Sequence, residues 1–192
     1  MRRAGFHLVL CAAVLCCLTA SAATNRTLSV EERVDLSEEI VVGRVVDSMA
    51  EWQGKLIVTV STVEVSETIK GRIAGTVEVT QLGGTAAHPD SGISVTMTAS
   101  SHVALAAGEE VLLFLGRRGS GPLQLVGAQA GKYVVRPNPL TGLRELPVGP
   151  KVLDTTRGDR QDAVRAESIS LDTMRRRIRT HMGESPGLGV GR

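Results

Sequence analysis

The chain has 192 residues, of which 42% are hydrophobic, and its 22 Lys and Arg nearly balance 20 Asp and Glu. This balance provides no overall electrostatic attraction to nucleic acid. Aromatic residues make up only 2% of the chain, which argues against a base-stacking platform for single-stranded nucleic acid.

The first 22 residues have the pattern of a secretory signal peptide. Arg2 and Arg3 form a basic start, Leu8 to Leu18 is apolar but short for a membrane span, and Ala20-Ser21-Ala22 is a small-residue cleavage site. The three cysteines all fall within it: Cys11, Cys16 and Cys17. A retained anchor or a lipoprotein signal fits less well, because the apolar run is short and leucines precede two of the cysteines. The pattern predicts a secreted or periplasmic protein that begins at Ala23 and has no disulfide.

Residues 23–37 are predicted to form a polar lead and a short helix. Ser29 matches an N-cap and Glu32 stands at the N3 position, so the two form a capping box. The helix is expected from about Val30 to Leu36, lying over one end of a β-domain. The expected members of its small apolar side are Leu28, Val34 and Leu36.

Two runs rich in β-branched residues, Ile40–Val46 and Leu56–Val65, predict the central strands. The apolar phase changes within the second run, and a β-bulge near Ser61–Thr62 would restore it. Two short strands with a kink, or a twisted strand buried on both faces, remain alternatives. A long, bulged strand of this kind can serve two sides of a small barrel.

Further strands are expected along residues 38–150. Val77 and Val79 alternate with polar residues, Ile93–Thr98 has a half-buried pattern, and the continuous run Val111–Leu115 predicts burial on both faces. Additional strands are expected at Leu123–Val126 and Lys132–Arg136, the latter ended by Pro137. The pattern predicts an all-β domain, a small OB-like barrel of five to seven antiparallel strands with a short N-terminal helix and a C-terminal helix.

The C-terminal part is predicted as a small hairpin at Leu140–Pro150, a linker at 151–169, a closing helix at 170–182 and a disordered tail at 183–192. Ser170 is the expected N-cap, and the apolar stripe comprises Leu171, Met174 and Ile178. The helix also carries a basic cluster: Arg175, Arg176, Arg177 and Arg179. This cluster has the charge to touch an anionic membrane surface, nucleic acid or an acidic partner, but the solvated outer face of a docked helix explains it better.

Three predicted loops at one end of the barrel form the candidate binding surface: Asp47–Lys55, Gly83–Gly92 and Arg117–Pro122. The candidate binding residues within them are Trp52, Arg117 and Arg118. Trp52 serves either surface recognition or, more commonly for a lone Trp, the filling of one barrel end. The glycine-rich segment lacks G-x-G-x-x-G spacing and a following helix, so a flexible hairpin loop is expected instead of a phosphate cradle.

A metal site is the only candidate chemistry. His88, Asp90 and His102 flank one predicted strand and would supply three ligands with an open position, as in a catalytic zinc site. Exposed histidines on two neighbouring loops explain the pattern more simply. No H-E-x-x-H or G-x-S-x-G motif is present, and the adjacent glutamate pairs point in different directions, so no catalytic residue and no cofactor are predicted.

Three segments together resemble netrin-type modules and the N-terminal domains of tissue inhibitors of metalloproteinases: Leu36–Val45, Thr62–Gly71 and Ala107–Leu115. They also resemble secreted bacterial domains of unassigned function, some of them found with matrixin-like proteases. The resemblance implies a five-stranded OB-type barrel with flanking helices. The inhibitors bind the protease zinc through an N-terminal cysteine, and no cysteine follows Ala23 here, so that mechanism is not implied.

These observations predict a secreted, non-catalytic binding or accessory module that recognises another secreted or envelope protein through its barrel-end loops. No nucleic-acid partner and no transmembrane segment after signal removal are expected. A metal-dependent hydrolase and a structural cell-envelope protein are the alternatives, the latter suggested only by the basic closing helix.

Overall fold

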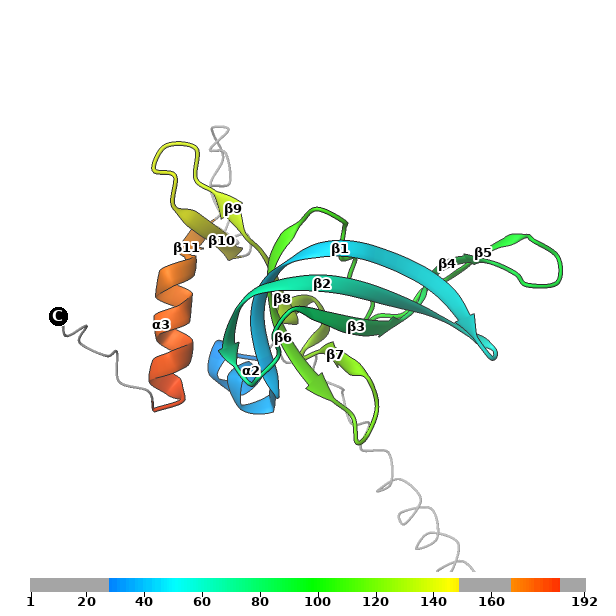
Figure 1. The fold of residues 1–192 in the computed structure, drawn as a ribbon, viewed down its shortest axis with the longest axis horizontal. Coiled ribbons are helices and arrows are strands. Elements are labelled where there is room, and N and C mark those ends of the chain that lie inside the picture. The colour runs from blue at the N-terminus through cyan, green and yellow to red at the C-terminus, as the bar shows by residue number, and fades with distance from the viewer. Residues whose placement is uncertain (1–27, 149–166, 184–192) are drawn as a thin grey trace, which may run out of the picture.

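The computed structural model describes residues 28–148 and 167–183 (Figure 1). The predicted signal peptide, residues 23–27, linker residues 151–166 and tail residues 184–192 lie outside these ranges. In chain order the elements are α2 (Val30–Leu36), β1 (Glu39–Gln53), β2 (Leu56–Lys70), β3 (Thr76–Leu82), β4 (Gly84–Ala87), β5 (Ser94–Met97), β6 (Glu110–Arg117), β7 (Leu123–Leu125), the 3-10 turn η2 (Ala128–Gly131), β8 (Lys132–Val134), β9 (Arg136–Pro137), β10 (Arg144–Val148), β11 (Glu167–Ser170) and α3 (Leu171–His181).

Six strands form the main sheet, in the order β3-β2-β1-β6-β7, with β8 also paired to β6. All of its strand pairs are antiparallel, as predicted. In Figure 1, β1 and β2 form a long arching arm over β3. No backbone ladder joins β3 to β7 in the part of the chain that the structure describes, so the sheet is strongly curved but open.

The first part of β1, from Ile40 to Gly43, and most of β6 are buried on both faces. One face packs under the two helices, in a cluster of Val30, Val34, Ile40, Val42, Ile69, Leu112, Phe114, Val135, Leu146, Leu171, Met174 and Ile178. The other face lies within the curved sheet, in a cluster of Val41, Val45, Val63, Val77, Val79, Leu105, Val111, Leu113, Leu115 and Leu123. The expectation that Val111–Leu115 is buried on both sides is confirmed.

The bulges lie elsewhere than the sequence predicts. Opposite Thr62 and Val63, where a bulge was expected in β2, the extra residue is Val46 of β1. β2 keeps one inward phase from Ile57 to Val65 and has its own register shift at Ser66. An interpretation based on β2 alone was wrong because the phase of a ladder depends on both partners.

Buried hydroxyl groups explain how β2 keeps this phase. Thr59 and Ser61 point inward, at 7% and 0% exposed, although they are polar. Thr59 Oγ1 donates to the Gly83 carbonyl at 2.7 Å, and the hydroxyl groups of Ser61 and Ser48 lie 2.9 Å apart. Each buried hydroxyl therefore has a partner, which offsets the cost of removing it from water.

Two predicted loops are largely strands. Residues 47–53 belong to β1 and pair with β2 up to Gln53 and Leu56, so the turn is much shorter than Asp47–Lys55. Within the predicted flexible loop Gly83–Gly92, β4 pairs with β5 in a hairpin that projects beyond the arm (Figure 1). A Cβ atom at Gly84 would lie 2.8 Å from the Ala50 Cβ, so the hairpin is seated closely on β1.

The short N-terminal helix α2 has the predicted bounds and capping box. The Glu32 backbone N–H donates to Ser29 Oγ at 3.1 Å, and the Ser29 N–H donates to the Glu32 carboxylate at 2.8 Å. Its buried side differs from the prediction, because Leu36 is 59% exposed while Arg33 is 4% exposed.

The C-terminal helix α3 is confirmed, with Ser170 as N-cap and its predicted apolar stripe buried against the sheet. The hairpin predicted at Leu140–Pro150 begins earlier in the chain, because its first strand is β9 (Arg136–Pro137), which pairs with β10. Pro137 therefore lies within a strand, although it was expected to end the preceding one. The predicted linker is wrong at its end, because residues 167–169 belong to β11 and pair with β10. Neither α2 nor α3, the helices in the described ranges, is long and apolar enough to cross a membrane.

Candidate functional site

The strongest candidate site is a groove where the sheet fails to close. It has a volume of about 850 Å³, and we call it the β3–β7 groove. Its lining residues are Leu28, Leu36, Gln53, Val58, Thr80, Gln81, Leu82, Ser101, Gly116, Arg117, Arg118, Pro122, Gln124, Leu125, Val126, Gly127 and Ala128. The lining is mainly apolar and uncharged polar, and its only charged members are the two arginines.

The walls of the groove are held by specific contacts. Gln81 of β3 is buried and makes two hydrogen bonds with the Val103 backbone, donating at 2.9 Å and accepting at 2.7 Å. These bonds fix β3 to the segment that follows β5. On the other wall, Arg117 forms an ion pair with Glu38 at 2.5 Å, and the same carboxylate accepts the Arg117 backbone N–H at 3.0 Å.

A second hollow of about 580 Å³ adjoins the groove and shares Gln53, Thr80 and Pro122 with it. Its charged lining is entirely acidic: Asp47, Glu51 and Glu78. The strand register places Asp47, Thr62 and Glu78 in one row across β1, β2 and β3. We call this surface the acidic hollow. The two adjoining surfaces therefore carry opposite charge.

The predicted binding residues divide between two places. Arg117 and Arg118 line the β3–β7 groove together with Pro122, whereas Trp52 does not. Trp52 is half-buried and makes an edge-to-face contact with His88, at 5.3 Å between ring centroids. This contact joins the end of β1 to the β4–β5 hairpin, so Trp52 fills the end of the arm.

The predicted metal site is not formed. No group of three His, Cys, Asp or Glu side chains within residues 28–148 and 167–183 is placed to hold a metal ion. His88 packs on Trp52, and its Nδ1 accepts the Asp90 backbone N–H at 3.3 Å. His102 is half-buried beside Gly83, with its Nδ1 buried. The two histidines thus make different local contacts instead of facing a common centre.

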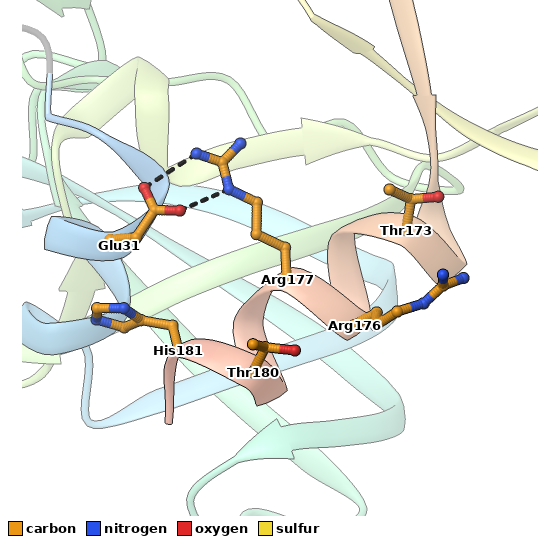
Figure 2. A pocket seen from close by; sticks show the side chains of 6 residues that line it. All are labelled: Glu31, Thr173, Arg176, Arg177, Thr180 and His181. Atoms are coloured by element: carbon orange, nitrogen blue, oxygen red, sulfur yellow. Dashed lines mark hydrogen bonds and ion pairs between the residues drawn. The ribbon is translucent and has the colours of Figure 1, made fainter. Parts of the chain in front are cut away.

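A third cavity, of about 420 Å³, lies between α2 and α3 (Figure 2). Its lining residues are Glu31, Thr173, Arg176, Arg177, Thr180 and His181. Arg177 donates two hydrogen bonds to the Glu31 carboxylate, at 2.6 and 3.0 Å, whereas Arg176 extends away from it (Figure 2). This hydrogen bonding lowers the pKa of Glu31 to about 2.

Three arginines of the basic cluster on α3 form ion pairs with neighbouring elements. Arg177 pairs with Glu31, and both Arg175 and Arg179 pair with Glu67 of β2. The prediction of a solvated outer face agrees with the exposure of Arg177 and Arg179, at 47% and 48%. Arg175 is only 21% exposed, and it shares the Glu67 carboxylate with Arg179. The register shift at Ser66 explains this pairing, because it turns Glu67 toward α3. With most of its charge paired, the α3 surface is a poor candidate for binding an anion.

The sequence interpretation did not find the groove. It identified Arg117, Arg118 and Pro122 as one exposed turn, but the other wall consists of β3 residues that were expected to form part of a closed barrel. An apolar residue at an outward position, such as Leu82 at 42% exposed, was the available signal.

Comparison with known proteins does not identify the chain: no protein-family model, no curated protein and no solved structure matches it.

Proposed function

We propose that the chain is an exported, OB-like accessory module that binds another secreted or envelope protein through the β3–β7 groove. The observation that carries the proposal is the open edge of the main sheet, which leaves a groove of about 850 Å³ between segments distant in the chain. Grooves of this size that combine apolar side chains with polar groups are typical of recognition sites.

The edge of β3, which lies close to β7 without a backbone ladder between them, adds a physical reason for protein binding. The Gly83 N–H donates to the Ile57 carbonyl at 2.8 Å, which marks Gly83 as one of the residues whose backbone faces β2. Since hydrogen-bonded pairs alternate along an antiparallel ladder, the backbone groups of Thr80 and Leu82 point away from β2. Unpaired backbone groups beside apolar side chains favour an extended polypeptide as ligand.

The alternative of a metal-dependent hydrolase has no support from the site, because His88, Asp90 and His102 do not converge. A structural envelope role is supported only by the basic α3 helix, most of whose arginines already form ion pairs with α2 or β2. Neither alternative explains an open apolar groove.

Site-specific photo-cross-linking tests the proposed function. A benzophenone amino acid placed at Gln124 lies in the groove, whereas one at Leu140, which is 91% exposed, lies outside it. The processed protein is exposed to the envelope and medium of its source cells and illuminated. We expect one defined cross-linked protein from position 124 and not from position 140.

The control is a variant that keeps the fold but places a charge in the apolar part of the groove. Leu82→Asp adds a charge at a partly exposed position, so it should leave the circular dichroism spectrum unchanged and abolish the cross-link from position 124. Cross-linking that is absent from the groove, or equal at both positions, would show that the groove is not the binding site.

A further inference from the structure

The charges around the β3–β7 groove determine what kind of segment fits it. Within the groove the charged side chains are Arg117 and Arg118, and Arg117 is already neutralised by Glu38 at 2.5 Å. Arg118 is exposed and has no ion pair with any residue in the described ranges. The groove thus offers one unpaired positive charge beside an apolar surface.

The adjoining acidic hollow restricts the ligand from the other side. Asp47 and Glu78 have no cationic partner among residues 28–148 and 167–183, and Glu51 accepts a hydrogen bond only from Gln53. A negatively charged ligand that extended from the groove into this hollow would be repelled. An acidic group of the ligand is therefore tolerated near Arg118 and excluded beyond Thr80 and Pro122. The ligand is thus expected to bind in one orientation, with its acidic end at Arg118.

The apolar lining supplies the remaining contacts. Leu36 and Leu82 are 59% and 42% exposed, and both line the groove together with Leu125 and Val126. Apolar side chains of a ligand would cover them, while the outward backbone groups of Thr80 and Leu82 accept and donate hydrogen bonds.

We propose that the β3–β7 groove binds an extended segment of the partner protein in which apolar side chains adjoin a carboxylate. That carboxylate pairs with Arg118. This inference rests on the proposed function. The carboxylate is an Asp or Glu side chain within that segment. Both have the same chemistry toward a guanidinium group.

The test uses fluorescein-labelled nine-residue peptides and fluorescence anisotropy. Each peptide has a Leu-Thr-Leu core, and the flanking pair is Glu-Glu, Lys-Lys or Gln-Gln. A fourth peptide carries the carboxylate only at a free C-terminus, and its amidated form is the comparison. We expect the Glu-flanked peptide to bind at least about fivefold more tightly than the Gln-flanked one. A gain that appears only with the free C-terminus would overturn the assignment to an Asp or Glu side chain.

A charge reversal identifies the pairing residue. Arg118→Glu should weaken binding of the acidic peptide by about tenfold and strengthen binding of the Lys-flanked peptide. Arg176→Glu is the matched control, because Arg176 is an exposed cation of α3 outside the groove, and it should change neither affinity.

The outcomes separate this inference from the proposed function. Preference for the Lys-flanked peptide, or affinity that Arg118→Glu does not change, would overturn the inference while cross-linking from Gln124 still supports the groove. Sedimentation of the protein alone tests whether the groove instead binds a second copy of the chain. A dimer that Leu82→Asp dissociates would assign the groove to a second copy of the chain and would also overturn the inference.

Discussion

The two ends of β1 have opposite environments within one strand. Up to Val45, its apolar residues are buried between the helix-covered cluster and the interior of the curved sheet. After the bulge at Val46, the strand continues into an arm whose outward residues, such as Met49 at 63% exposed, have no covering helix. The comparison indicates that the proximal half supplies the stability of the fold, whereas the distal half borders, with β3 and β7, the surface proposed for binding.

The largest expected difference between the two regions is in core packing. Phe114 is fully buried between α2 and the sheet, and Phe114→Ala should lower the free energy of unfolding by about 3–5 kcal/mol because it leaves a cavity. Leu82→Ala in the groove should change that free energy by no more than about 0.5 kcal/mol. Urea denaturation measures both, and equal losses would contradict the division into a stabilising and a binding region.

A buried cation gives the next largest effect. The Arg33 guanidinium donates to the Ala130 carbonyl and, at 2.8 Å, to the Tyr133 hydroxyl, and it lies 5.1 Å from the centre of the Phe114 ring. Arg33→Met leaves these buried acceptors without a donor and should cost about 1–3 kcal/mol of unfolding free energy.

Arg176→Met is the control for this substitution, since Arg176 is exposed, and it should be neutral within about 0.5 kcal/mol. Chemical denaturation of the two variants compares them directly. Unchanged or increased stability of Arg33→Met would show that its buried hydrogen bonds do not offset the cost of removing the guanidinium from water.

The smallest effect is the pH dependence of helix docking. The hydrogen bonds from Arg177 lower the pKa of Glu31 from 4.5 to about 2. A carboxyl group with a lowered folded-state pKa stabilises the protein fully above the unfolded value, and this contribution is lost as the pH falls from about 4.5 toward 2. Because Glu31 and Arg177 are 36% and 47% exposed, solvent screening limits the contribution to about 1 kcal/mol or less.

The measurement compares wild type with Glu31→Gln in urea at pH 7 and at successively lower pH. The variant should be slightly less stable at pH 7, and the difference should shrink toward pH 2 because Glu31 is then protonated in the unfolded state and increasingly protonated in the folded state. A difference that persists unchanged at pH 2 would show that the carboxylate charge is not its source.

The features predicted correctly are those that depend on neighbours in the chain. The capping box of Ser29 and Glu32 and the N-cap at Ser170 involve residues three positions apart, so their hydrogen bonds form wherever the helix forms. Val111–Leu115 was assigned to the core because its unbroken apolar run permits no solvent-facing side.

The site was only partly predictable. Arg117 and Arg118 were identified as exposed cations of a turn, but nothing near them in the chain shows that Leu82 forms part of the same groove. The pairing of Arg177 with Glu31 also joins residues far apart in the chain. Such contacts depend on how the sheet curves and where its bulges fall, which local patterns do not encode.

The sequence by itself determined the antiparallel β-rich character, the two capped helices and the doubly buried β6 strand, because strand alternation, caps and apolar runs act over a few residues. Only the tertiary structure decided that Val46 carries the bulge, that Arg33 is buried and that β3 and β7 do not pair with each other. The physical reason is that register, curvature and sheet closure are set by the fit between strands from distant parts of the chain.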